Sequence, residues 1–325
     1  SSLSEEAITS SQLEGASTSR VRAKEMLREG RRPQDRSEQM ILNNYEAMQE
    51  IIALKDEPLS PGLIREIHRR VTTDTLDDPS DAGRIQRPGD ERVHIYGTQD
   101  QDQILHVPPP AEELPERMAA LCAFANSTAA GEGPYMPPLL RAITLHFMMG
   151  YDHYFADGNG RTSRAVFYWS MLRQGFFLAE FLSISRLLRR APARYARSFL
   201  YTEDDDGDLT YFYLEQARVI VRAIDDLDKY LTRKTAELRG ANRFLRGRGL
   251  NHRQVAVIER FLRDPGATAT VADHQARHNV VAQTARTDLQ DLERRGYLAS
   301  AKQGRRVVWF PAEDLARRLG ADPSS

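Results

Sequence analysis

Hydrophobic positions recur at helical spacing over most of this chain. The clearest case is residues 36–57, where apolar side chains follow the 3.6-residue period of an amphipathic helix at Met40, Ile41, Tyr45, Met48, Ile51 and Ile52. Similar patterns predict helices over residues 59–74, 110–127, 137–155, 161–175 and 208–240. Ser60 and Pro61 are typical of a helix start, and Gly175 of a helix end. The expected fold class is therefore mainly α.

One segment, residues 92–110, alternates instead. Val93 and Ile95 alternate with polar neighbours, a turn follows from Gly97 to Gln103, and apolar residues resume at Ile104. This pattern predicts a β-hairpin inserted between helices, with an irregular loop as the alternative. Because no neighbouring strand would cover the hairpin, its edge could pair with an extended peptide from another protein.

The composition changes near residues 240–250, which are rich in glycine and arginine. A length of 325 residues favours two domains, and we expect residues 233–250 to be the linker between them. From Ala241 onward the chain has 15 Lys and Arg against 9 Asp and Glu, although the net charge of the whole chain is −1. The basic tail is therefore expected to meet an acidic partner.

Residues 251–325 show three helical patterns followed by two short strands around Gln303 and Gly304. This order resembles a winged helix-turn-helix, with residues 280–298 as the recognition helix. In that arrangement the side chains expected to pack inward are Val281, Leu289 and Leu292. The side chains expected to contact DNA are Gln283, Thr284, Arg286, Thr287, Arg305 and Arg306. A protein-interaction module remains the alternative.

Cys122 is the one cysteine of the sequence, which excludes an internal disulfide and favours a reducing compartment, the cytoplasm. It lies in an apolar helical pattern, so we expect a buried structural thiol. No apolar run approaches the ~18 residues of a membrane span, and no signal peptide is visible, so no membrane partner is expected.

The most unusual local chemistry lies in residues 153–164, HYFADGNGRTSR. Both flanks have helical periodicity, which favours a loop between two helices over a hairpin. Gly158 and Gly160 would allow the N–H groups at the start of the second helix to form an anion-binding nest. Arg161 and Arg164 are three residues apart and so lie on one side of that helix. Cations oppose the dipole at a helix N-terminus, so their presence indicates a bound anion.

Asp157 would be repelled by a phosphate in this nest unless a cation lay between them. This predicts a Mg²⁺ ion with Asp157 as its ligand. His153 precedes the loop and could take a proton from an attacking hydroxyl group. The residues alone therefore indicate nucleotidyl or phosphoryl transfer, with a purely structural loop as the alternative.

The same twelve residues resemble the Fic motif, HPFxxGNGRxxR, with Tyr154 where the family usually has proline. The resemblance covers about residues 36–232 and includes the helical layout and a hairpin flap. It implies a protein adenylyltransferase, which moves AMP from ATP to a Ser, Thr or Tyr hydroxyl of a target protein. In the flap, Val93, His94 and Ile95 would dock the target.

The resemblance also implies a role for each motif residue. His153 would be the general base, and Asp157 would hold Mg²⁺. The phosphates would be held by Gly158, Asn159, Gly160, Arg161 and Arg164. The sequence does not secure adenine as the base of the nucleotide. Tyr195 could line the base pocket, or it could pack in the core.

Residues 10–15, SSQLEG, resemble the Fic inhibitory motif, [S/T]xxxE[G/N], which begins here at Ser10. Apolar residues Leu3, Ala7 and Ile8 predict a short helix that Gly15 ends, within an N-terminal segment of residues 1–35. The resemblance implies that Glu14 pairs with Arg164 and blocks the γ-phosphate of ATP. In some relatives the same glutamate supports AMP removal, so the reverse reaction stays open.

Two further questions stay open: whether the chain is a nucleotide-sensing DNA regulator, and whether it forms a homodimer.

Overall fold

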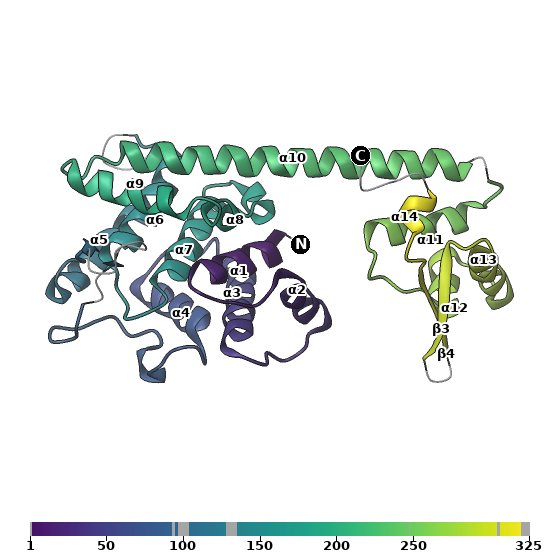
Figure 1. Ribbon diagram of the computed structural model, residues 1–325, viewed down its shortest axis with the longest axis horizontal. Helices are drawn as coiled ribbons and strands as arrows, with labels where there is room; N and C mark the ends of the chain where they lie inside the picture. The colour runs from purple at the N-terminus through teal and green to yellow at the C-terminus, as the bar shows by residue number, and fades with distance from the viewer. Residues whose placement is uncertain are drawn as a thin grey trace. The chain divides into compact units, whose positions relative to one another are not determined.

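The computed structural model describes residues 2–92, 95–96, 104–127, 135–246, 248–303 and 306–319. The chain divides into two compact units, Ser1–Leu227 and Asp228–Ser325. Each unit has a hydrophobic core of its own. Helices make up most of both units, so the mainly α fold class is confirmed (Figure 1).

The first unit contains a series of helices and a small hairpin. Its α-helices are α1 (Ser2–Leu13), α2 (Arg20–Glu29), α3 (Arg36–Ala53), α4 (Pro61–Thr72), α5 (Leu114–Asn126), α6 (Pro138–Asp152), α7 (Asn159–Arg173), α8 (Ile184–Leu188) and α9 (Pro192–Asp204). Short 3₁₀ helices are η1 (Pro79–Asp81), η2 (Ala111–Glu113) and η3 (Phe177–Phe181).

Helix α10 (Thr210–Arg246) begins in the first unit and continues past the expected start of the linker. Residues 233–246, which the glycine and arginine content assigned to a linker, are helical. Gly240 is the one glycine between Thr210 and Arg246. A single glycine costs about 1 kcal/mol in a helix, which is too little to end one of this length.

The signals that start and end these helices are local in sequence. The Ser60 hydroxyl accepts a hydrogen bond from the Leu63 N–H at 3.1 Å, and Pro61 is the first residue of α4, as expected. Asp35 caps α3 in the same way through the Glu38 N–H. Beyond α7, Gly175 has φ +86, the left-handed conformation that ends a helix and that glycine adopts without strain.

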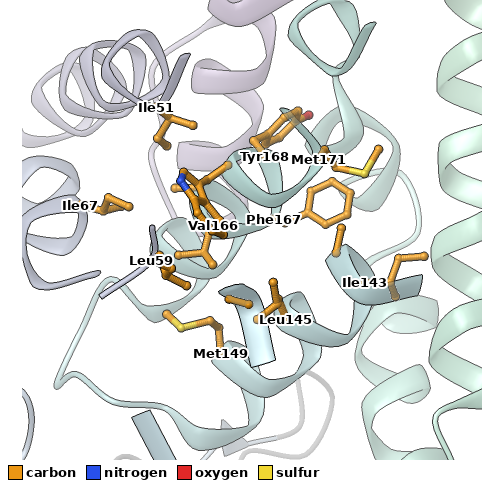
Figure 2. Close-up of a cluster of buried hydrophobic side chains, with 14 of the residues drawn as sticks. Ile51, Leu59, Ile67, Ile143, Leu145, Met149, Val166, Phe167, Tyr168 and Met171 are labelled. Atoms are coloured by element: carbon orange, nitrogen blue, oxygen red, sulfur yellow. The ribbon is translucent and has the colours of Figure 1, made fainter. Parts of the chain in front are cut away.

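Helix α7 is the central element of the first unit and is buried along nearly its whole length. Figure 2 shows its side chains among those of α3, α4 and α6. The labelled members of this cluster are Ile51, Leu59, Ile67, Ile143, Leu145, Met149, Val166, Phe167, Tyr168 and Met171. Packing on several sides fixes the helix, and the loop of residues 153–158 enters at its N-terminus.

The predicted hairpin is present. Strands β1 (Ile95–Tyr96) and β2 (Ile104–His106) pair antiparallel, with Ile95 opposite His106 and Tyr96 opposite Ile104. The turn, residues 97–103, lies outside the described residues, and so do Val93 and His94.

After the end of α10, the second unit has the predicted order of three helices and two strands, followed by one further short helix. Its elements are α11 (His252–Arg263), α12 (Val271–His278), α13 (Ala282–Arg294), β3 (Leu298–Gln303), β4 (Arg306–Pro311) and α14 (Leu315–Arg318). Strands β3 and β4 pair antiparallel, and Ala269 forms an isolated bridge to Trp309. The identification of this unit as a winged helix stays a prediction.

The expected inward face of α13 is correct at two of three positions. Leu289 and Leu292 are fully buried, but Val281 is 67% exposed, so its assignment to the core is wrong. Val281 is the N-cap residue, with extended backbone before the first helical turn, and the helical period therefore does not apply to it.

Of the residues expected to contact DNA, Gln283, Arg286, Thr287 and Arg306 are exposed and Thr284 is half-buried; Arg305 lies outside the described residues.

Cys122 is buried in α5, as expected, and burial raises the pKa of its thiol to about 11. In the part of the chain that the structure describes, no helix combines the length and the apolar character needed to cross a bilayer.

Candidate active site

A cavity of about 310 Å³ opens at the N-terminus of α7. It brings together the loop that precedes α7, the end of α1 and one face of α9. The lining residues are Glu14, His106, Gly150, His153, Ala156, Asp157, Gly158, Asn159, Gly160, Ser163, Arg164, Tyr195, Ala196, Phe199, Leu200 and Glu203. Of the predicted site residues of the first unit whose side chains the structure describes, Ser10 and Arg161 are not among the lining residues.

His153 caps the C-terminus of α6 in the left-handed conformation, with φ 50 and ψ 59. Its Nδ1 lies 3.0 Å from the Gly150 carbonyl oxygen. A carbonyl can only accept, so Nδ1 carries the proton and Nε2 keeps a free lone pair. Burial lowers the pKa of the ring below its ordinary value, which keeps the imidazole neutral near pH 7. His153 can therefore accept a proton at Nε2.

Tyr154, the departure from the Fic motif, is fully buried. Its hydroxyl donates to Asp152 Oδ2 at 2.6 Å, and Arg117 Nη1 donates to Oδ1 of the same carboxylate at 3.1 Å. Burial raises the pKa of Asp152, and these two donors offset part of that effect. The tyrosine thus supplies a partner for a buried acid beside His153, which proline could not do.

The turn between His153 and α7 is held by its own asparagine. Asn159 Oδ1 accepts from the Phe155 N–H at 2.9 Å, and Asn159 Nδ2 donates to the Phe155 carbonyl at 2.6 Å. The Asn159 side chain is therefore committed to the loop, and its backbone N–H is the group that remains for a phosphate. Gly158 has φ +83, and a Cβ there would collide with Thr72. Only glycine fits this position.

His68 of α4 fixes the same loop from outside, which the sequence did not indicate. Its Nδ1 accepts from the Gly83 N–H and its Nε2 donates to the Asp157 carbonyl, both at 2.8 Å. The ring also stacks on Phe155, with centroids 3.7 Å apart. Burial lowers the pKa of His68 to about 4, so the ring is neutral and this tautomer is retained at pH 7.

Asp157 lies two residues before the start of α7, and its side chain is half exposed. Its oxygens lie 3.8 Å from Arg161 Nη2 and 3.8 Å from Arg36 Nη2. No group of three or more His, Cys, Asp or Glu that could hold a metal occurs in the described ranges. One accessible carboxylate fits Mg²⁺, which commonly takes few protein ligands and completes its shell with phosphate oxygens and water.

Arg161 is buried, and its Nη1 donates to the Val71 carbonyl at 2.7 Å. Within the described part of the chain its Nε has no hydrogen-bond partner. A buried unpartnered N–H of a cation is costly, and an anion at the start of α7 would remove that cost.

Arg164 and Glu14 form the predicted contact. Arg164 Nη2 lies 2.7 Å from Glu14 Oε1, and the guanidinium also donates to the Ser10 hydroxyl at 2.8 Å and the Ser10 carbonyl at 3.0 Å. The Glu14 carboxylate lies directly over Gly160, where a Cβ would overlap it. A carboxylate thus lies at the N-terminus of α7, where the helix dipole favours negative charge.

Helix α1, which carries Ser10 and leads to Glu14, is itself buried from Glu5 to Ser11. Glu6 anchors it to the start of α8, where its carboxylate accepts from the Ser185 N–H at 3.0 Å, the Ser183 hydroxyl at 3.3 Å and the Ser185 hydroxyl. Burial raises the pKa of Glu6. Ile8 packs with Ala23, Met26 and Ile41 on another side. The segment is an integral part of the first unit.

The far end of the cavity is formed by α9. Tyr195 lines it, and its hydroxyl lies 2.9 Å from His146 Nε2. Apolar side chains Phe199 and Leu200 continue this wall. Glu203 closes it and lies 2.9 Å from His106 Nδ1 of β2. An apolar wall with a polar end is typical of a pocket for a nucleobase.

The central segment of the chain matches a known protein family. Residues 58–171 match the model of the Fic/DOC family. Residues 58–171 form a Fic/DOC family domain. The Fic domain contains α4 to α6, the hairpin, the HYFADGNGRTSR loop and most of α7.

Curated relatives of the Fic domain carry the name protein adenylyltransferase Fic. The relative from Nematostella vectensis is 28% identical over 171 residues, which are 53% of this chain and 34% of that protein. The relative from Aedes aegypti is 32% identical over 127 residues, which are 39% of this chain and 21% of that protein. The chain therefore spans about a third of these relatives or less.

Solved structures support the fold beyond the Fic domain. A Fic family protein from Desulfovibrio desulfuricans G20 has a TM-score of 0.60 at 18% identity, covering 96% of this chain and 86% of that one. Fic-1 from C. elegans has a TM-score of 0.52 at 22% identity, covering 70% of this chain and 62% of that one.

Proposed function

We propose that this protein is a protein adenylyltransferase, which transfers AMP from ATP to a Ser, Thr or Tyr hydroxyl of a target protein. The observation that carries the proposal is that His153, the N-terminus of α7 and Arg164 line one cavity. A base and an anion site in one cavity are what attack of a hydroxyl on a phosphate requires. The name of the curated relatives supports the same activity.

In this proposal His153 is the general base. Its Nδ1 proton is committed to Gly150, so Nε2 accepts the proton of the target hydroxyl. The hydroxyl oxygen forms a bond to the α-phosphorus as the bond from that phosphorus to the bridging oxygen breaks. Pyrophosphate leaves with the bridging oxygen, and the target keeps the AMP.

The phosphates of ATP would be held at the start of α7. We assign them to the N–H groups of Gly158, Asn159 and Gly160 and to the guanidinium groups of Arg161 and Arg164. The unpartnered Nε of Arg161 supports an anion at this place. Asp157 would hold Mg²⁺, which when bound neutralises part of the charge of the phosphates.

Glu14 would keep the enzyme inhibited. Its carboxylate takes the Nη2 donor of Arg164 that a distal phosphate would need, and its negative charge repels that phosphate. Transfer would then require that Glu14 leave Arg164, whereas the rest of the cavity can stay as it is.

The hairpin would dock the target. Ile95 lies in β1, and with Val93 and His94 it would pair with an extended segment of the target by strand addition. This pairing would bring the modified hydroxyl group toward His153.

The buried Cys122 supports a reducing compartment, for which we propose the cytoplasm.

The proposal is tested by incubating the Glu14→Gly variant with ATP and a cell lysate and searching for AMP on Ser, Thr and Tyr by mass spectrometry. Parallel reactions with GTP, CTP and UTP test the choice of the base. Incubation of a modified target with the wild-type protein tests the reverse reaction. Sedimentation of the same samples tests for a homodimer. Modification that is absent with all four nucleotides would contradict the proposal.

A second candidate function is DNA binding by the second unit as a winged helix. The observation that favours it is the exposed polar face of α13, with Gln283, Arg286 and Thr287, opposite buried Leu289. A DNA titration monitored by fluorescence anisotropy tests it. If Arg286 contacts a phosphate, Arg286→Ala weakens binding. It also reduces the slope of the logarithm of the binding constant against the logarithm of the salt concentration by about 1. Arg263→Ala on α11 is the charge-matched control. Binding that is independent of salt would contradict the assignment.

A further inference from the structure

Arg92 lies at the base of the hairpin, just before β1, and reaches the backbone of the catalytic loop. Its Nη2 donates to the Asp152 carbonyl at 2.8 Å, and its Nη1 donates to the His153 carbonyl at 2.9 Å. Its Nε donates to the Pro109 carbonyl at 2.9 Å, and Nη1 also contacts Gln86 Oε1. All four acceptors are uncharged oxygens, which is unusual for a half-buried arginine.

Two of these acceptors belong to the C-terminus of α6. The last carbonyls of a helix have no partner within it, and a cation there also offsets the helix dipole. His153 follows in the left-handed conformation, at φ 50, which costs a residue other than glycine roughly 1 kcal/mol or more. The guanidinium group holds the carbonyls of the two peptide units that flank the His153 Cα, so it stabilises the conformation that directs the His153 ring into the cavity.

The other acceptors connect the same arginine to the hairpin. Pro109 follows β2 in the chain, and Arg92 itself precedes β1, so one side chain joins both ends of the hairpin to the His153 backbone. Gln86 extends this connection, because its N–H donates to the Tyr154 carbonyl at 2.9 Å. The hairpin and the histidine therefore share one set of hydrogen bonds.

We propose that Arg92 is a positioning residue, which sets the orientation of His153 and couples it to the base of the hairpin that docks the target. This assignment rests on the proposed adenylyl transfer. Arg92 touches neither ATP nor the target hydroxyl; it acts through the Asp152 and His153 carbonyls.

The charge of Arg92 gives this role a signature that a purely structural role lacks. Burial is the main cause of the lowered pKa of His153, and the electrostatic interactions with His106 and with the positive charge of Arg92 lower it further. Glu14 and the Gly150 carbonyl act in the opposite direction. Loss of the Arg92 charge therefore makes His153 easier to protonate, and base catalysis is then lost at a higher pH.

The experiment compares Arg92→Gln with Arg92→Lys, each in the Glu14→Gly protein. For Arg92→Gln we expect kcat to fall roughly tenfold or more, since small displacements of a base are costly, while KM for ATP stays within about twofold. The acid limb of the kcat/KM profile moves to higher pH in Arg92→Gln and stays in place in Arg92→Lys, which keeps the charge. Arg117→Gln is the control, because Arg117 contacts the Asp152 side chain and not the carbonyls.

A second readout does not depend on activity. NMR titration of the His153 ring in Glu14→Gly and in Glu14→Gly/Arg92→Gln measures its pKa directly, even if no AMP transfer is detected and the proposed function fails. A higher pKa of His153 in the Arg92→Gln protein is the expected result. An unchanged titration, or an equal upward shift in Arg117→Gln, would overturn the assignment.

Discussion

Arg164 Nη2 lies 2.7 Å from Glu14 Oε1, although 150 residues separate the two in the chain. The arginine side chain is 4% exposed and that of the glutamate 27%. The pair is thus open to solvent on the side of the glutamate, where ATP would approach. Four predictions concern the residues around this pair and the loop beside it.

The first prediction concerns Ser10, whose hydroxyl accepts from Arg164 Nε. A hydrogen bond to a charged group contributes about 1.5–3 kcal/mol, and Ser10→Ala removes one while the Ser10 carbonyl contact remains. We expect AMP transfer to rise roughly threefold to tenfold, less than in Glu14→Gly, measured as initial rate. The matched control is Ser11→Ala. Ser11 is equally buried, but its hydroxyl donates to the Met40 carbonyl. Equal activation by both changes would contradict the prediction.

The second prediction uses Gly160 to test where the Glu14 carboxylate lies. A Cβ at this helical position would overlap the carboxylate, so Gly160→Ala should destabilise the protein by ~1 kcal/mol or more. In the Glu14→Gly background this carboxylate is gone, and the same change should be neutral or stabilising by up to about 1 kcal/mol, because alanine favours a helix over glycine. Free energies of unfolding in urea are measured for the wild type, Gly160→Ala, Glu14→Gly and the double variant. Together they give the coupling energy between positions 14 and 160. If Gly160→Ala costs the same in both backgrounds, the carboxylate does not occupy this position.

The third prediction concerns Tyr154. Tyr154→Phe removes the hydroxyl that donates to Asp152 and leaves a buried carboxylate with one donor fewer. We expect the free energy of unfolding to fall by about 1–3 kcal/mol. Tyr201→Phe is the control, because Tyr201 is 48% exposed. Proline in place of Tyr154, as in the usual Fic motif, should destabilise further, because it also leaves a cavity. A Tyr154→Phe protein as stable as the wild type would show that the tyrosine only fills space.

The fourth prediction concerns pH. Burial lowers the pKa of His68 to about 4 and that of His146 to about 3. In the unfolded chain both titrate near 6.5, so below that pH the unfolded state binds protons that the folded state does not. Stability of the first unit is therefore full above about pH 6.5 and falls as the pH drops toward 4.

Unfolding in urea, followed by the fluorescence of buried Trp169 in a Trp309→Phe background, isolates the first unit for this test. Between pH 6.5 and 5 each histidine should cost about 2 kcal/mol. His68→Gln should show a smaller loss over this range than the protein that keeps His68. A loss of equal size in both would show that His68 does not titrate in this way.

Much of this fold and site could be predicted because the signals are local. The helical period, the Ser60 cap and the alternating hairpin each depend on neighbours in sequence. The HYFADGNGRTSR loop is contiguous, so its base, glycines and cations could be located together. The Glu14 motif could be linked to Arg164 through the resemblance to Fic.

Other features arise from contacts between distant segments. His68 precedes the loop that it fixes by 85 residues or more, and nothing in the local pattern of α4 marks it. The Asn159 side chain binds the loop backbone, which a list of phosphate-binding residue types cannot reveal. Val281 followed the helical period but precedes the helix, since the period does not show where the first turn begins.

The central claim is transfer of AMP by His153 under the control of Glu14. The most direct measurement is the initial rate of label transfer from α-labelled ATP to protein by the wild type, Glu14→Gly, and Glu14→Gly/His153→Ala. We expect Glu14→Gly to be at least ~10-fold faster than the wild type, and loss of the base to reduce that rate by about 10²–10⁴. No labelling by Glu14→Gly, or equal labelling without His153, would contradict the account.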